Sequence, residues 1–118
     1  MKLTQVSDDK DVVCLACEGR ISQNDFEPGK DPMEAVLGSN GFSRKVLVNL
    51  EKTNYIDSSG IGWLVICHRH FVGAQGMMVL HSVPPRVYQV LELIGLPKVL
   101  HFANDETSAR AKAQGGKS

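Results

Sequence analysis

Residues 55–64, YIDSSGIGWL, place a carboxylate and two adjacent hydroxyls between a strand-like run and an apolar, helix-like run. A helix that begins there leaves its first N–H groups unpaired, and Asp57 or Ser58 can accept hydrogen bonds from them. The same helix end carries about half a positive charge, so it also tolerates a phosphate on a serine. Two interpretations therefore stay open. The residues only start a helix, or one hydroxyl is modified by another protein.

Two cysteine and histidine spacings suggest metal chemistry, and neither is convincing. Cys14 and Cys17 form a C-x-x-C pair, but residues three apart in a strand point to opposite faces and cannot share an ion. Cys67 and His70 lie one helical turn apart, yet two aligned ligands do not close a zinc site. His81 and His101 would join them only through the tertiary fold. We therefore expect small buried thiols, no bound metal and no cofactor.

A serine hydrolase is the third hypothesis for the two hydroxyls. The sequence around Ser58 is Asp-Ser-Ser-Gly-Ile. It lacks the Gly-x-Ser-x-Gly elbow that presents a nucleophilic serine. The chain also has no glycine-rich phosphate loop, so any ATP belongs to a partner. We expect no enzymatic activity.

The composition describes an ordinary single domain. The chain has 118 residues, 42% hydrophobic and 22% charged, with a formal net charge of zero. This balance argues against binding to nucleic acid or an anionic membrane. No apolar run approaches the roughly 20 residues of a membrane span, no signal-peptide core is present, and three cysteines fit reduced thiols. We expect a cytoplasmic protein with one domain over residues 1–113 and a flexible tail over 114–118.

The hydrophobic pattern alternates strands and helices. Runs at 12–17, 45–50 and 77–82 are typical of strands, the alternating residues 3–7 predict an edge strand, and residues 98–102 are a weaker candidate. Helices are expected from Ile61 to about Gly73, after a cap at Ser82, and over 105–113 after a cap at Asn104. Val87, Leu91 and Ile94 form the inward stripe of the second. Residues 19–43 predict a long loop and then a short helix with Met33, Val36 and Leu37, started by Asp31 and Pro32. This order predicts an α/β fold with a mixed sheet and stacked helices.

The helix after Ser58 has a predicted orientation. Helical spacing places six residues toward the sheet and three outward. The inward set is Ile61, Leu64, Val65, His68, Phe71 and Val72, and the outward set is Trp63, Ile66 and His70. The only tryptophan would then stand exposed beside Ile66, about one turn from Ser58, as an anchor for a partner.

A longer stretch carries a family resemblance. Residues 45–65, KVLVNLEKTNYIDSSGIGWLV, resemble the signature of STAS domains, in particular the bacterial anti-sigma-factor antagonists. The likeness extends through GMMVLHSVPPRVYQVLELIGLPKVLHF and covers residues 45–103, with a further match over residues 2–21. The combination of motif, order and spacing carries this resemblance, since Asp-Ser-Ser-Gly alone is a weak signal.

The resemblance implies a four- to five-stranded mixed sheet with helices mainly on one face, and a regulatory role in transcription. Such antagonists bind a partner-switching anti-sigma factor, a serine/threonine kinase that phosphorylates the first serine of the motif, and a matching phosphatase resets them. Carried over, Ser58 is the phosphoacceptor and Ser59 a supporting hydroxyl or the alternative acceptor. Asp57 lies beside Ser58 at the N-terminal end of the helix, and Gly60 lets the partner approach the backbone closely. The expected state is a monomer or weak dimer.

One region departs from the family pattern. The family follows its second strand with Gly-Glu-Leu-Asp and a full amphipathic helix, whereas this chain has GRISQNDFEPGKDP with no acid at the Asp position. This region borders the family's partner-docking surface, so the change bears on which kinase is recognised. A non-switching STAS adaptor or a stressosome-like scaffold component is the alternative function.

Overall fold

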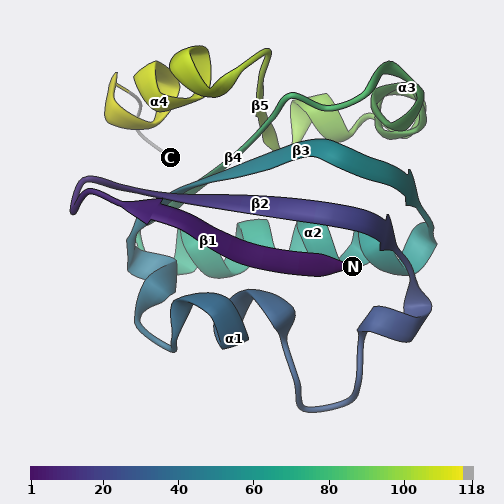
Figure 1. Cartoon of the computed structure of the whole chain (residues 1–118), viewed down its shortest axis with the longest axis horizontal. Helices are drawn as coiled ribbons and strands as arrows, with labels where there is room; N and C mark the ends of the chain where they lie inside the picture. The colour runs from purple at the N-terminus through teal and green to yellow at the C-terminus, as the bar shows by residue number, and fades with distance from the viewer. Residues whose placement is uncertain (116–118) are drawn as a thin grey trace.

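Five strands form one mixed sheet in the order β1-β2-β3-β4-β5 (Figure 1). They are β1 (Lys2–Asp8), β2 (Val12–Ile21), β3 (Lys45–Ile56), β4 (Met77–His81) and β5 (His101–Ala103). β1 pairs antiparallel with β2, and the remaining pairs are parallel. The structure, a computed structural model, describes residues 1–115. The predicted mixed sheet is confirmed, including its weak last strand.

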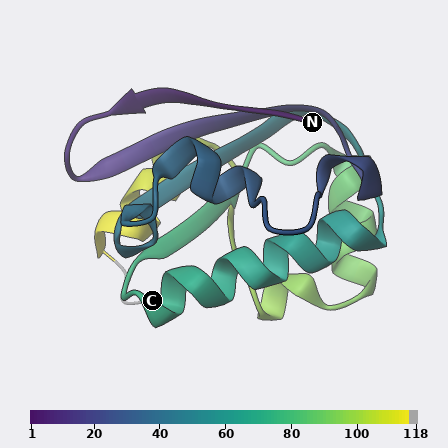
Figure 2. The same cartoon turned by 90° about the horizontal axis from the view of Figure 1, so that it is seen from below.

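Helices cover both faces of the sheet unequally. α1 (Pro32–Leu37) and α2 (Ser58–Gly73) lie on one face, and α4 (Glu106–Gly115) lies on the other (Figures 1 and 2). α3 (Pro85–Leu93) adds Val87 and Leu91 to the larger core cluster, which α1 and α2 share. α4 buries only Ala109 and Ala113, against a small second cluster. The expectation of helices mainly on one face is confirmed, and α4 is the exception.

The C-terminal ends of β2 and β3 are brought side by side. The two strands pair from Val12 opposite Lys45 to Ile21 opposite Ile56, with two irregularities in register between. Their central residues are buried and largely β-branched or aliphatic, as strands covered on both faces require. Asp57 follows Ile56 directly, so the first turn of α2 begins against the end of β2.

The three cysteines are buried and unpaired. Cys17 belongs to the larger core cluster and Cys14 to the smaller one on the opposite face, which confirms that they cannot share an ion. Burial raises the pKa of the Cys67 thiol and of the Cys17 thiol, so both stay protonated at neutral pH. Within residues 1–115, no three side chains of the metal-ligating types converge.

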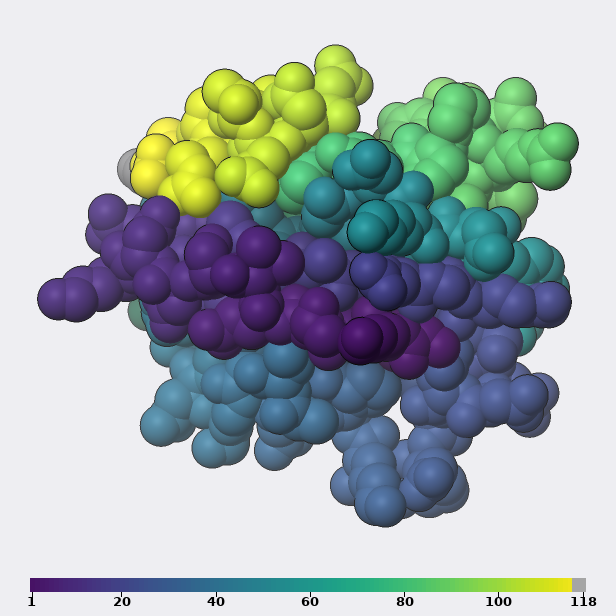
Figure 3. Space-filling model, in the orientation of Figure 1, coloured from purple at the N-terminus to yellow at the C-terminus, as the bar shows by residue number. Residues whose placement is uncertain are grey.

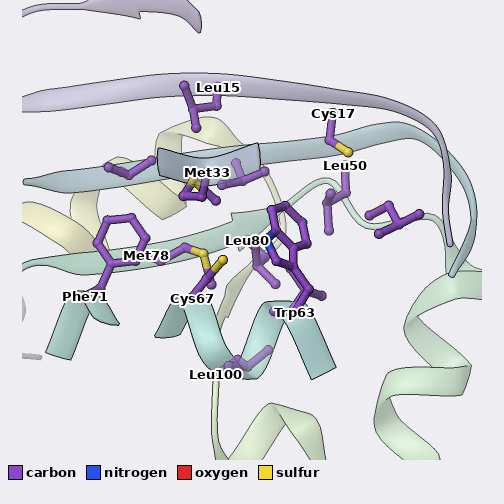
Figure 4. Packing of buried hydrophobic residues seen from close by; sticks show 14 of the residues in the cluster. Leu15, Cys17, Met33, Leu50, Trp63, Cys67, Phe71, Met78, Leu80 and Leu100 are labelled. Atoms are coloured by element: carbon purple, nitrogen blue, oxygen red, sulfur yellow. The ribbon is translucent and has the colours of Figure 1, made fainter. Parts of the chain in front are cut away.

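Trp63 is buried, and the prediction that it faces outward is wrong. Its side chain is 8% exposed and packs in the same cluster as Cys67 and Phe71 (Figure 4). The reason is that a chain segment lies over the side of α2 that the helical pattern assigned to solvent. The Trp63 indole N–H donates to Asp31 Oδ1 at 3.0 Å. Ile66 is 51% exposed and His70 is exposed, as predicted.

Four smaller predictions are also wrong. Val72 and Ile94 are exposed rather than inward; Ile94 follows the last residue of α3 and leaves its helical stripe. Pro84, not Ser82, is the N-cap of α3, and Ser82 instead has φ +56° with its hydroxyl 2.9 Å from His81 Nδ1. Asp105, not Asn104, accepts the Ser108 N–H at the start of α4.

In the predicted tail, residues 114 and 115 belong to α4, and 116–118 lie outside the described residues.

Replacing Trp63 tests its placement in the core. We expect Trp63→Ala to lower the free energy of unfolding by about 3–5 kcal/mol, because it removes a large buried ring and leaves a cavity. Ile66→Ala, on the exposed face of the same helix, should change it by less than about 0.5 kcal/mol. Denaturant unfolding of both variants measures the difference. Equal free energies of unfolding in the two variants would show that Trp63 lies at the surface and not in the core.

Candidate functional site: the start of helix α2

Asp57 joins two segments that lie 34 residues apart. Its Oδ1 accepts the Gly60 N–H at 2.9 Å and so caps α2, while its Oδ2 accepts the Gln23 N–H at 3.0 Å. Its own N–H donates to the Ile21 carbonyl at 3.1 Å. The carboxylate therefore fixes the start of α2 to the chain that leaves β2.

The hydrogen bonds to Asp57 also set its charge. Its pKa is lowered chiefly by the Gly60 N–H, with further lowering by the N–H groups of Gln23 and Ser59. Partial desolvation and the nearby Asp25 carboxylate oppose this effect without reversing it. Asp57 is therefore anionic at neutral pH, and both of its oxygens are already engaged.

Ser58 and Ser59 are the first two residues of α2 and both are exposed. Position and exposure leave their hydroxyls accessible at the positive end of a helix 16 residues long. Of the two caps that the sequence left open, Asp57 and Ser58, the structure uses Asp57. Neither serine hydroxyl is therefore needed to cap the N-terminal end of α2.

Gly60 is required by close packing rather than by backbone conformation. A Cβ at this position would lie 2.7 Å from Ile56 Cγ1, 2.8 Å from Ile21 Cγ2 and 2.9 Å from the Ile21 carbonyl oxygen. The start of α2 therefore presses directly on the ends of β2 and β3. Gly62, half a turn later, faces open space, with no atom within 4 Å of such a Cβ.

The segment from residue 22 to 31, hereafter the 22–31 loop, is tied to α2 at its other end by Trp63. Asp31 Oδ1 accepts the Met33 N–H at 2.9 Å, which caps α1, and also the Trp63 indole N–H. The Phe26 and Trp63 rings lie 5.5 Å apart between centroids, tilted by 35°. In Figure 3 part of this loop projects from the molecule below the sheet.

A groove of about 610 Å³ opens between the 22–31 loop and α2. Ser59, Gly62, Ile66 and His70 line it from one stripe of the helix. The side of the loop and α1 contributes Phe26, Asp31, Pro32 and Glu34 among others. This hollow is hereafter called the α2 groove.

The structure brings together most of the predicted site residues. Asp57, Ser58, Ser59 and Gly60 form one junction, and Ile66 lies on the groove beside it; Trp63 supports the groove from a buried position. No pattern in the sequence indicates Gln23, Phe26 or the second role of Asp31 as part of this site. Asp31 followed by Pro32 signals a helix start, but no local pattern reveals a bond to a tryptophan 32 residues later.

The amino-acid sequence matches the sequence model of a known family. The sequence model of the STAS domain matches residues 3–109, most of the chain. The chain belongs to the STAS domain family. This confirms the resemblance and its fold.

Similar proteins come from several bacteria. A protein of Bordetella bronchiseptica named as an anti-sigma factor antagonist, BtrV, is 28% identical over 112 residues, covering 94% of this chain and 93% of its own. A crystal structure from Thermotoga maritima, titled an anti-sigma factor antagonist, has a TM-score of 0.78 at 20% identity over 89% of each chain. The phosphorylated form of the Bacillus protein SpoIIAA has a TM-score of 0.60 at 16% identity, over 93% of this STAS chain and 98% of its own. The two structural matches support the fold alone.

The helices of this STAS domain are also too short or too polar to cross a lipid bilayer, as far as residues 1–115 describe them. α2 is the longest, and its 16 residues fall below the roughly 20 that a span needs.

Two neighbouring glycines of α2 provide a matched test of the junction. Gly60→Ala should lower the free energy of unfolding by about 1–3 kcal/mol, since the new methyl must push the Ile21 carbonyl away. Gly62→Ala should raise it by about 0.5–1 kcal/mol, because alanine favours the helix and meets no neighbour. Thermal or denaturant unfolding distinguishes them. Equal effects of the two substitutions, or a gain in stability in Gly60→Ala, would contradict the close packing at Gly60.

Proposed function

We propose that this STAS protein is an anti-sigma-factor antagonist-like regulator, switched by phosphorylation at Ser58. It binds an anti-sigma factor that is also a serine kinase, and a matching phosphatase reverses the modification. The protein acts in the bacterial cytoplasm as a binding partner, with no catalysis or cofactor of its own. The observation that carries the proposal is the exposed Ser58 hydroxyl at the first residue of α2, free of the capping role that Asp57 performs.

The junction supplies what a phosphorylation switch needs. A phosphate on Ser58 would meet the positive end of α2 and leave the helix intact, because the capping hydrogen bonds come from Asp57. The rigid attachment of α2 to β2 and β3 presents this hydroxyl in a fixed position. The effect of the phosphate would then fall on the surface that a partner contacts. In this proposal Asp57, Ser58, Ser59 and Ile66 form that surface, and Gly60, which is buried against β2 and β3, positions them.

The direction of the switch follows from charge. Asp57 is anionic, so a phosphate beside it concentrates negative charge that an interface must desolvate. A kinase that phosphorylates Ser58 also holds its nucleotide phosphates next to this hydroxyl. The phosphoserine that forms then lies beside the phosphates that remain on the nucleotide, and the like charges repel each other. The unmodified protein should therefore bind its partner, and the phosphorylated protein should release it.

Phosphate transfer tests the acceptor. Incubation with the cognate anti-sigma kinase and ATP should add one phosphate, which mass spectrometry maps to Ser58. Ser58→Ala should abolish labelling, and Ser59→Ala, the matched control at the next residue, should keep it. Full phosphate labelling of Ser58→Ala, with loss of labelling in Ser59→Ala, would show that Ser59 is the acceptor.

Partner affinity tests the direction. Ser58→Asp should bind the same kinase at least about tenfold more weakly than the wild type, a cost of roughly 1.4 kcal/mol for the added charge in the interface. Titration calorimetry measures both affinities, with Thr107→Asp on the opposite face of the sheet as the control for charge alone. Tighter binding by Ser58→Asp would reverse the switch, and unchanged binding would favour a non-switching adaptor.

A further inference from the structure

The α2 groove has an apolar interior next to the proposed switch. Ile66 is 51% exposed on it, and Phe26, packed on Trp63, forms part of the opposite wall. Gly62 leaves the second turn of α2 without a side chain, so the groove reaches the helix backbone there. An apolar side chain of another molecule can therefore lie between Ile66 and Phe26, where it would cover surface that is now exposed to water.

The wall of the groove is acidic, although the whole chain has no net charge. Glu27, Asp31 and Glu34 lie in or beside it, with Lys30 as the one cation among residues 22–34. Lys30 Nζ lies 3.2 Å from Glu27 Oε2 and compensates that carboxylate. Among residues 1–115, no cationic group forms an ion pair with Asp31 or Glu34. Two carboxylates thus border the apolar interior without a counter-charge.

We propose that the α2 groove receives a segment of the anti-sigma kinase in which a large apolar side chain is flanked by lysine or arginine. The apolar side chain occupies the space between Phe26 and Ile66, and the cations pair with Asp31 and Glu34. Opposite charges at the edge of an apolar contact guide association and fix its register. This inference rests on the proposed function, because it names the chemistry of the partner that function requires.

The groove and the phosphoacceptor are separate parts of one surface. Ser59 lines the groove, whereas Ser58 does not. Successive helical residues point about 100° apart, so the two hydroxyls face different directions from the first turn of α2. The groove therefore contributes the same binding free energy in either phosphorylation state, and the charge at Ser58 weakens binding beside it. Variants of the groove should weaken binding by the same factor with or without Ser58→Asp.

The test uses the cognate anti-sigma kinase and two matched pairs of variants. Ile66→Ala should weaken binding by at least about fivefold, and Val72→Ala, equally exposed elsewhere on α2, should leave it unchanged. Glu34→Lys should weaken binding by at least about fivefold at low ionic strength, and less at high ionic strength. Its control is Glu106→Lys, which reverses an acidic residue in the first turn of α4 on the other face of the sheet.

The outcomes separate this inference from the proposed function. Loss of affinity in Ile66→Ala and Glu34→Lys, with both controls normal, supports the groove as the docking site. Normal affinity in both groove variants, with Ser58 still labelled by the kinase, overturns the groove and leaves the switch intact. Tighter binding by Glu34→Lys would assign the groove an acidic partner segment and also overturn the inference. A kinase that neither binds the wild type nor labels Ser58 overturns both proposals.

Discussion

The carboxylate of Asp57 is the interaction on which the rest of the site depends. One oxygen caps α2 through the Gly60 N–H, and the other holds the Gln23 N–H at the start of the 22–31 loop. Because the Asp57 N–H also donates to the Ile21 carbonyl, the end of β2, the loop and the helix are fixed by one residue. Any alanine or larger residue at position 60 would push these elements apart. The position of Ser58 in space is a consequence of this arrangement.

A second carboxylate completes the attachment from the opposite side. Asp31 belongs to the loop and caps α1, and it also binds the indole of Trp63 on α2. The 22–31 loop is thus joined to α2 at both ends, once by a carboxylate of the helix junction and once by a carboxylate of the loop. Asp57 and Asp31 each cap a helix and also accept a hydrogen bond from an N–H group that is distant in sequence. The α2 groove exists because these two attachments hold the loop beside the helix without filling the space between them.

Local and periodic features were predictable from the sequence, and contacts between distant segments were not. The strands, the start of α1 at Asp31, the breaks at glycine and the exposed Ile66 follow from spacing and turn chemistry. The orientation of Trp63 failed because helical periodicity gives the side of a residue but does not say what covers that side. Its cover, the 22–31 loop, has no regular pattern of its own. The same limit hid Gln23, whose only contribution is a backbone N–H, a group that every residue except proline carries.

Amide hydrogen exchange in the Asp57→Ala protein measures the central interaction most directly. If Asp57 holds both segments, the amides of Gln23 and Gly60 should exchange faster together, although they lie 37 residues apart in sequence, while amides in the middle of α2 keep their protection. Asp25→Ala offers a control, since its carboxylate holds the Ser22 N–H and not Gln23 or Gly60. Faster exchange at Gly60 with unchanged exchange at Gln23 would show that Asp57 is only a helix cap, and would contradict the account of a loop and helix fixed by one carboxylate.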